Sequence, residues 1–587
     1  MSYDLMLKNA LSLHESGHLD EAEKIYRQIL VTAPDHPDIL NLLGLVAQAK
    51  NNHSEACSLF MNAIKNKSDN VAYYYNLAFS LKSSGRTQEA LDCFLKVAGM
   101  KPEIKETYNE IALLYQKKED LFEARKNWIY AISLDKTFTD AKINLALSYR
   151  GENTGKAIDD LKKLAYEDAN NGAVFYYLAS LYFDRKNWEE AWKNAIKAKE
   201  LAPTSDEVRV LLGKLSYLDQ QIDNAKIYFA KAELLNPYNT EAIEGLADIY
   251  SREGNYTEAE LRYKKLIEFD RNNYKYHSNY AEMLQRSGRI SEALEEYRAA
   301  VIINPQSAEI SNNLALILRD IGEFDEALGL LFNALSYAPQ MDEVSINIYE
   351  TLVMLSETDS VKANKIAENW FTNYKDNVFA KRIYAASKGE KIENHQIYIQ
   401  KLFDNFADNY ELVMQNLDYS VPMAMGRIAG ALEGRIVDLG CGTGLVGEII
   451  KNDRNKLIGV DISNKMLEVA SAKKVYDKLI KDDIVSFLQN TSECFDWAIA
   501  ADVFGYIGDL SPIIKSLKNK KIIFSVEVSD EVESPFILSL NGRYKYNTYY
   551  IIKLLYENSF VNIKTEELIL RSDNGNPVKG KIFLCKK

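Results

Sequence analysis

Ile436-Val-Asp-Leu-Gly-Cys-Gly-Thr-Gly-Leu-Val-Gly447 is the most informative stretch of this 587-residue sequence. Its first four residues are mostly apolar and β-branched, which is typical of a buried parallel strand. Gly440, Gly442 and Gly444 follow at alternate positions, so the backbone can turn tightly and approach a ligand without interference from Cβ atoms. A helix is predicted over 445–451. Together these features predict a nucleotide site at the carboxyl edge of a parallel sheet.

Two nucleotide chemistries fit this loop. The spacing Gly442-x-Gly444-x-x-Gly447 matches the dinucleotide fingerprint, which has low specificity by itself. Asp438, at the strand end, argues against a dinucleotide because a carboxylate would face a pyrophosphate unfavourably. It suits a cationic ligand, such as the amino-acid end of S-adenosylmethionine (SAM), whose ammonium and sulfonium are both positive. A second strand, 456–460, ends at Asp461, whose carboxylate can accept hydrogen bonds from both hydroxyls of a ribose.

These residues carry a resemblance to a known family. Asp438-Leu-Gly-Cys-Gly-Thr-Gly444 resembles motif I of class I SAM-dependent methyltransferases, and Val460-Asp-Ile-Ser-Asn-Lys-Met466 resembles their second motif. The resemblance implies SAM as the cofactor and an acid near its adenine amino group. Either Asp482 or Asp483 could be that acid, and Asp483-Ile484 aligns better with the residues downstream. The implied cofactor-binding residues are Asp438, Gly440, Gly442, Gly444, Asp461, Ile462, Met466, Asp482, Asp483, Ile484, Asp502 and Tyr410.

Composition narrows the function classes. The net charge is −13, and an acidic chain lacks the basic footprint of a nucleic-acid binder. The five cysteines form no CxxC pair, which argues against a zinc cluster or a disulfide framework, so no metal site is predicted and a reducing cytoplasm is expected. The N-terminus resembles no secretory signal, and no apolar run approaches the roughly 20 residues of a membrane helix. The composition leaves the oligomeric state open.

Residues 1–340 are repetitive. An alanine recurs at intervals of 34 residues, with one interval of 33, at Ala22, Ala56, Ala90, Ala124, Ala157, Ala191, Ala225, Ala259, Ala293 and Ala327. An aromatic residue follows many of these alanines by four positions, and a large–small pair recurs earlier in each unit. The pattern resembles the tetratricopeptide repeat, a 34-residue helix-turn-helix, in ten copies. Such units stack into a superhelix with a concave face, so we expect an α solenoid that binds a protein or peptide.

The residue before the large–small pair is an asparagine in four units. A carboxamide donates and accepts hydrogen bonds at once, so these asparagines are candidates for binding a peptide backbone. Other units have leucine, glutamate, tyrosine or glycine at the same place, so the ladder is partial. An alternative interpretation is that they are solvated polar positions on a helix face. The four candidates are Asn76, Asn144, Asn279 and Asn313.

After the repeats, residues 341–395 are predicted to form a degenerate helical cap, and 396–587 to form the catalytic domain. Strands and helices alternate from residue 435 onward, with a helix predicted over 546–558, and the series ends in two strands, which predicts a Rossmann-like α/β sheet. The resemblance implies seven strands with an antiparallel last strand. A helical stretch is predicted over 394–417, in which Phe406 and Tyr410 either cover the cofactor or pack only against each other.

The part of the site that would bind the methyl acceptor is less well defined. Asp502 and Tyr506, which follow the fourth strand, are the candidate catalytic residues, and Glu527 is interpreted as structural. The sequence around Gly542-Arg543-Tyr544 resembles predicted methyltransferases that carry an N-terminal tetratricopeptide array. It makes Arg543, Tyr544 and Tyr546 candidates for substrate binding. The catalytic domain has no histidine after His395, so a histidine base would have to come from the repeats or the linker.

The sequence therefore predicts a SAM-dependent methyltransferase whose repeats recruit a protein or peptide. The acceptor atom stays open. One alternative is an interaction scaffold whose SAM-binding domain is catalytically silent or sensory. A dinucleotide oxidoreductase is disfavoured by Asp438.

Overall fold

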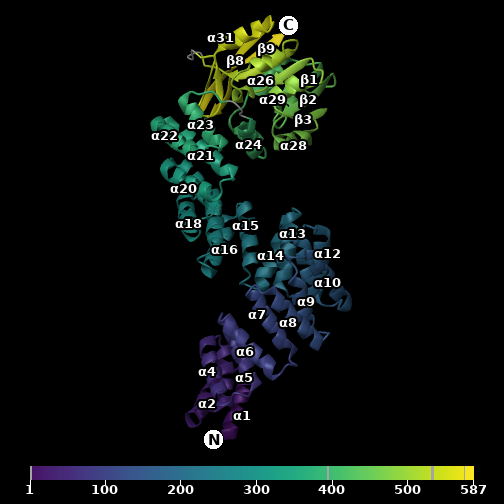
Figure 1. The fold of residues 1–587 in the computed structure, drawn as a ribbon, viewed down its shortest axis with the longest axis vertical. Coiled ribbons are helices and arrows are strands. Elements are labelled where there is room, and N and C mark those ends of the chain that lie inside the picture. The colour runs from purple at the N-terminus through teal and green to yellow at the C-terminus, as the bar shows by residue number, and fades with distance from the viewer. Residues whose placement is uncertain (1–2, 393–395, 530–533, 574, 587) are drawn as a thin grey trace. The chain divides into compact units, whose positions relative to one another are not determined.

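The computed structural model describes residues 3–392, 396–529, 534–573 and 575–586 (Figure 1). The chain divides into two compact units, Met1–Arg262 and Tyr263–Lys587. None of the helices in the described residues is long and apolar enough to span a membrane.

The first unit consists of paired antiparallel helices. Its helices are α1 (Tyr3–Glu15), α2 (Leu19–Thr32), α3 (Pro37–Ala49), α4 (His53–Asn66), α5 (Val71–Ser83), α6 (Thr87–Met100), α7 (Lys105–Lys117), α8 (Leu121–Leu134), α9 (Thr139–Leu147), α10 (Thr154–Glu167), α11 (Gly172–Asp184), α12 (Trp188–Leu201), α13 (Asp206–Leu218), α14 (Ile222–Leu235) and α15 (Thr240–Arg252), followed by α16 (Tyr256–Phe269), which crosses the boundary between the units.

Small residues explain why these helices pair so closely. All ten repeated alanines are fully buried. At the large–small pair, a Cβ on Gly44 would lie 2.6 Å from the ring of Phe60, and one on Gly213 would lie 2.7 Å from the ring of Phe229. The aromatic side chain of one helix therefore fills the space that the small residue of its partner leaves.

The second unit begins with the remaining helix pairs and continues into an α/β domain. Its first helices are α17 (Tyr274–Arg286), α18 (Ile290–Ile303), α19 (Ala308–Asp320), α20 (Phe324–Tyr337), α21 (Asp342–Thr358), α22 (Ser360–Asn373) and α23 (Val378–Lys388). The predicted loss of the 34-residue period after 340 coincides with α21, which has 17 residues instead of the usual 13 or 14. We call α21–α23 the cap.

The α/β domain follows the cap. Its elements are α24 (Gln396–Phe406), α25 (Tyr410–Asn416), α26 (Val421–Ala429), β1 (Gly434–Leu439), α27 (Leu445–Ile450), β2 (Asn455–Asp461), α28 (Asn464–Lys473), β3 (Lys478–Lys481), α29 (Ile484–Asn490), β4 (Trp497–Ala500), the 3₁₀ helix η1 (Phe504–Tyr506), α30 (Ser511–Ser516), β5 (Lys521–Glu527), β6 (Phe536–Leu538), β7 (Tyr544–Tyr546), α31 (Thr548–Glu557), β8 (Asn562–Asp573) and β9 (Asn576–Lys586).

The large sheet has seven strands in the order β3-β2-β1-β4-β5-β9-β8, drawn in green and yellow in Figure 1. Strands β1 to β5 are parallel, and β9 runs antiparallel to both β5 and β8. The predicted Rossmann-like fold with an antiparallel last strand is confirmed. The strand order reverses between β1 and β4, which is where ligands bind in such sheets.

Alternate residues of the central strands pack on opposite faces of the sheet. Val437 and Leu439 of β1 join a core with α29, α30 and α31, whereas Ile436 joins a second core with α26 and α27. Both faces are therefore covered, which accounts for the nearly continuous apolar character of β1 and β5.

The helical stretch predicted over 394–417 consists of two helices, α24 and α25, and residues 394 and 395 lie outside the described ones. One sequence prediction of local structure needs correction. Tyr546, predicted to begin a helix, belongs to β7. The helix begins only after Asn547, whose side chain accepts hydrogen bonds from the backbone N–H groups of Tyr549 and Tyr550 and so forms its N-cap.

Candidate active site

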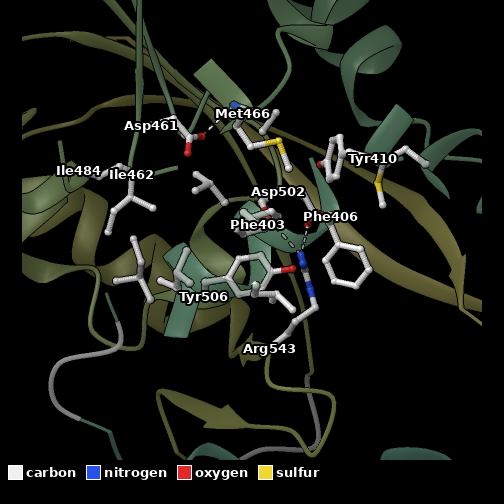
Figure 2. A pocket seen from close by; sticks show the side chains of 18 of the residues that line it. Phe403, Phe406, Tyr410, Asp461, Ile462, Met466, Ile484, Asp502, Tyr506 and Arg543 are labelled. Carbon is white, nitrogen blue, oxygen red and sulfur yellow. Dashed lines mark hydrogen bonds and ion pairs between the residues drawn. The ribbon is translucent and has the colours of Figure 1, made fainter. Parts of the chain in front are cut away.

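A cavity of about 270 Å³ lies at the carboxyl ends of the parallel strands (Figure 2). This volume is near the lower end of the range for ligand pockets, roughly 300–1,000 Å³. Residues that follow β1, β2, β3 and β4 form its floor, and α24 and α25 cover it. The cavity therefore lies at the point where the strand order reverses.

The glycine loop supplies the part of the floor next to β1. Gly440 and Gly442 line the cavity and have φ angles of +71° and +53°, which side chains rarely adopt. A Cβ on Gly440 would collide with Val503, whereas no described atom lies within 4 Å of a Cβ on Gly442. Gly440 is therefore required for packing, and the space beside Gly442 is available to a ligand.

Asp461, at the end of β2, is fixed beside this loop. Its Oδ2 accepts a hydrogen bond from the backbone N–H of Gly442 at 2.9 Å, and its Oδ1 accepts one from Ser463 at 2.9 Å. Burial raises its pKa above the ordinary value, although these backbone bonds oppose the rise. No lysine or arginine among the described residues pairs with Asp461, so its charge has no cationic partner in that part of the chain.

Asp438 is the second acid beneath the loop, and it is only 1% exposed. Its Oδ2 accepts a hydrogen bond of 2.6 Å from the hydroxyl of Tyr476. Burial, together with the charge of Asp461, raises the pKa of Asp438 to about 7, and the bond from Tyr476 opposes that rise. Asp438 does not line the cavity directly, and the structure shows no cationic partner for it in the described part of the chain.

Tyr476 occupies a slot formed by glycines. A Cβ on Gly447 would lie 2.6 Å from its hydroxyl oxygen, and Cβ atoms on Gly444 and Gly459 would each lie 3.1 Å from its ring. Gly444 itself does not line the cavity. Part of the glycine pattern therefore accommodates the tyrosine that holds Asp438, rather than a ligand.

The two acids after β3 have different surroundings. Asp483 is the N-cap of α29, because its Oδ1 accepts hydrogen bonds from the N–H groups of Val485 and Ser486 at 3.0 Å. Asp482 accepts one hydrogen bond on Oδ1, from the N–H of Asp483. Both line the cavity with Ile484, but Asp482 keeps more free acceptor capacity.

Helices α24 and α25 cover the cavity with aromatic and aliphatic side chains, as Figure 2 shows for Phe403, Phe406 and Tyr410. The rings of Phe403 and Tyr506 lie 5.2 Å apart, edge to face. Asp404 of α24 accepts a hydrogen bond of 2.5 Å from the hydroxyl of Ser463, which anchors the cover beside Asp461.

The opposite wall contains a network of buried ion pairs. Arg543 pairs with Asp502 and Glu527, and Arg571 pairs with Asp502, Glu527 and Asp573. Burial alone raises the pKa of Glu527, but Arg543 and Arg571 outweigh it and hold that pKa below its ordinary value. Burial keeps the pKa of Asp502 above its ordinary value although the same guanidiniums oppose this. The cation of Arg543 also lies 4.6 Å from the ring centre of Tyr506.

Most of the predicted site residues meet at this cavity. Those that line it are Tyr410, Gly440, Gly442, Asp461, Ile462, Met466, Asp482, Asp483, Ile484, Asp502, Tyr506 and Arg543. Tyr544 and Tyr546 instead lie in the core, at most 1% exposed, and the hydroxyl of Tyr546 donates to the carbonyl oxygens of Phe504 and Ile507. The two tyrosines therefore pack against η1 on its core side, away from the cavity.

The four repeat asparagines lie on α5, α9, α17 and α19. Asn76 donates to Asn41 Oδ1 at 2.9 Å, and Asn144 donates to Asn109 Oδ1 at 3.1 Å. Each of these two carboxamides therefore already bonds to the preceding repeat, and peptide binding by the four asparagines stays a prediction.

Several residues of the cavity were not predicted from the sequence. Arg571 and Asp573 lie on β8, where the pairing with β9 shifts register between Ile569 and Arg571. This irregularity lets Leu570 and Arg571 both be buried, although they are consecutive. Asn541 and Phe403 were also not predicted as site residues, although Phe403 lies in the helical stretch predicted over 394–417.

Comparisons with known proteins agree with this architecture. A family model described as "Methyltransferase domain" matches residues 437–519. Models described as "Tetratricopeptide repeat" match residues 7–71, 71–104, 242–273 and 281–340.

Individual proteins match parts of the chain. Type IV pilus assembly protein PilF of Pseudomonas aeruginosa is 26% identical over 172 residues, 29% of this chain and 68% of that protein. The 18S rRNA (guanine-N(7))-methyltransferase RID2 of Arabidopsis thaliana is 40% identical over 65 residues, 11% of this chain and only 22% of that protein. A crystal structure of a tetratricopeptide repeat protein from Parabacteroides merdae is 19% identical, with a TM-score of 0.39, and the match covers 42% of this chain and 98% of that one.

The sheet order, the glycine loop and the cavity define a Rossmann-like domain with a ligand site at its strand switch point. The chain contains tetratricopeptide repeats, followed by a C-terminal domain that matches the methyltransferase family model.

Proposed function

We propose that this protein transfers the methyl group of SAM to a protein or peptide that its repeats recruit. The observation that carries the proposal is the pair of buried acids, Asp438 and Asp461, which have no cationic partner among the described residues. Buried charges are ordinarily paired, so these two favour a cationic ligand at the glycine loop.

The residues of the cavity fit the parts of SAM. Asp461 would hold its ribose, Asp438, buried beneath the glycine loop, would attract its ammonium end by charge, and Gly442 leaves space for close approach. Asp482 is the better candidate for the adenine amino group, because Asp483 already caps α29. SAM, when bound, supplies an electrophilic methyl group.

The acceptor side lies next to Tyr506. Both oxygens of Asp502 already accept hydrogen bonds, Oδ1 from Arg543 at 2.5 Å and Oδ2 from Arg571 at 3.2 Å. A proton from the acceptor would have to displace a guanidinium there, so we assign Asp502 a positioning role. The chain then has to exclude water and align an acceptor that needs no strong base, such as a neutral amine.

A labelled-methyl assay tests the proposal. The full chain is incubated with SAM carrying a labelled methyl group and a cell extract, which is then separated into protein, nucleic-acid and small-molecule fractions. We expect label in the protein fraction, and much less with Asp461→Asn. Asp453→Asn, in an exposed loop of the same domain, is the control and should match the parent.

Other outcomes would overturn specific parts of the proposal. Label in the nucleic-acid or small-molecule fraction would contradict a protein acceptor. Tight SAM binding without label in any fraction would favour the alternative, an interaction scaffold with a catalytically silent SAM-binding domain.

A further inference from the structure

The turn that carries Asn541 and Arg543 into the cavity is held from outside the α/β domain. It joins β6 to β7, and its Gly542 has a φ of +76°. Within the turn, the N–H of Gly542 donates to Ser539 O and the N–H of Ser539 donates to Arg543 O, both at 2.9 Å. These two bonds alone leave the carbonyl groups of Leu540 and Gly542 without partners inside the turn.

Two side chains of the cap supply those partners. The hydroxyl of Tyr349 in α21 donates to Leu540 O at 2.8 Å. Arg382 in α23 donates to Gly542 O from Nε at 3.1 Å and from Nη2 at 2.6 Å. Nη2 of Arg382 also reaches the carbonyl oxygen of Tyr506 at 3.5 Å.

Arg382 is itself rigidly placed. It is only 1% exposed, and its guanidinium carbon lies 4.4 Å from the ring centre of Tyr398 and 5.6 Å from that of Tyr544. No carboxylate in the described residues pairs with it, so its fixed contacts are backbone carbonyls and aromatic rings. The planar guanidinium of an arginine donates two hydrogen bonds in a fixed fork geometry, which the ammonium group of a lysine does not provide.

The two backbone segments that Arg382 joins both line the cavity. Tyr506 comes from η1, and Asn541 and Arg543 come from the turn. A Cβ on Gly542 would collide with the hydroxyl oxygens of Tyr349 and Tyr398, so the cap and the turn are closely fitted. Arg543, the next residue of the turn, forms ion pairs with Asp502 and Glu527, so the position of the turn also determines where these carboxylates are held.

We propose that Arg382 is a positioning residue for the acceptor side of the cavity, and that the cap of the repeat array thereby forms part of the active site. The expected effect of Arg382 on the reaction rate rests on the proposed methyl transfer. The expected effect on the structure around the cavity does not depend on it. Arg382→Lys keeps the charge and loses the fork, so Tyr506 and Arg543 should lose their alignment while the glycine loop is unaffected.

Hydrogen exchange of the full chain measures the structural consequence. In Arg382→Lys, we expect the amides of residues 504–507 and 539–543 to exchange roughly 3- to 10-fold faster, the range for losing one typical hydrogen bond. Amides of β1 should exchange as in the parent. Arg125→Lys is the matched control, because Arg125 also donates to a carbonyl oxygen, that of Ser148 at 2.7 Å, and lies over a tyrosine ring, that of Tyr149 at 4.0 Å.

The kinetic measurement separates positioning from general stability. With labelled SAM and saturating extract, Arg382→Lys should lower kcat about 10-fold or more, the scale of a small misplacement. The KM for SAM and the Kd for S-adenosylhomocysteine should stay within about twofold of the parent. Arg125→Lys should change none of these.

Tyr349→Phe provides a second variant if Arg382→Lys does not fold. It removes only the hydroxyl that bonds Leu540 O, so it should speed exchange in 539–543 alone. Unchanged exchange in these segments for both variants would overturn the inference. Loss of S-adenosylhomocysteine binding in parallel with kcat would also overturn it. If the parent shows no methyl transfer, the proposed function fails, whereas the exchange result still decides the inference.

Discussion

Two pairs of largely buried acids lie around the cavity, each at the carboxyl ends of two neighbouring strands, and only one of the pairs has arginine partners. Asp438 and Asp461 stand at the carboxyl ends of β1 and β2, and Asp502 and Glu527 at those of β4 and β5. The first pair has raised pKa values and no cationic partner in the described residues. The second pair shares Arg543 and Arg571.

The difference separates a place for a ligand from a structural support. A buried carboxylate without a partner is costly, so the fold tolerates it where a cation binds during function. A carboxylate paired with guanidiniums is already satisfied and holds the wall in place. We therefore propose that the pair beneath the glycine loop marks the ligand side and that the arginine network frames the acceptor side.

The largest predicted effect is the loss of stability when one of the paired acids is replaced. Glu527→Gln removes a charge without changing shape and leaves two buried guanidiniums short of a partner. Breaking a buried ion pair in this way costs about 3–5 kcal/mol. Hydrogen exchange of the β5 amides, 521–527, in the full chain should accelerate accordingly.

The same isosteric change at the unpaired acid provides the contrast. Asp438→Asn should leave β1 exchange unchanged or slower, because it removes a buried charge that has no cation beside it. Equal destabilisation by the two substitutions would mean that the two acid pairs do not differ as the structure indicates.

The next effect is on cofactor affinity. Asp461→Asn should weaken SAM binding by about 1.5–3 kcal/mol, the range for hydrogen bonds to a charged group. Titration calorimetry measures it directly. Asp573→Asn, on the arginine side, should change SAM affinity much less, and a similar loss in both variants would contradict the assignment of the ligand side.

The pH dependence of binding tests Asp438 itself. Its pKa is about 7 in the fold and about 3.9 in an unfolded chain. Its contribution to stability is therefore fully present below about pH 4 and is lost as the pH rises through about 7. The ammonium group of S-adenosylhomocysteine prefers the carboxylate, so affinity for this ligand should weaken up to about tenfold per pH unit below 7 and level off above it. The slope should vanish in Asp438→Asn, and a slope that survives there would assign the proton to Asp461.

The comparison also shows which parts of the site a sequence can reveal. The ligand side is local in sequence, because the glycine loop and Asp461 lie next to strand ends that apolar patterning predicts. The repeats were predictable for a similar reason, since each buried alanine recurs with a fixed period.

The acceptor side depends on contacts between distant residues. Arg571 stands 69 residues from Asp502, and it reaches the cavity only because β8 shifts register beside it. The strands β6 and β7 have three residues each, too few for a periodic signal, so Tyr546 was assigned to the following helix. Arg382 lies outside the predicted domain boundary at residue 396, and no local pattern links it to Gly542.

The smallest predicted effect concerns Tyr476, which forms a hydrogen bond with one of the two unpaired acids. The hydroxyl of Tyr476 donates to Asp438 and so favours its charged form. Tyr476→Phe keeps the ring in its glycine slot and removes only this bond, which raises the pKa of Asp438 further. Affinity for S-adenosylhomocysteine at pH 7 should then fall by about 0.5–1.5 kcal/mol, the range for one hydrogen bond.

At pH 9 the affinities of this variant and the parent should converge, because Asp438 is then charged in both proteins. A purely structural role for Tyr476 would instead weaken binding equally at both pH values. Tyr550→Phe is the matched control, since its hydroxyl also donates to a carboxylate, that of Asp509 at 3.1 Å, away from the cavity. Convergence at high pH in Tyr476→Phe, with no change in Tyr550→Phe, would show that Tyr476, held in its glycine slot, acts on binding by lowering the pKa of Asp438.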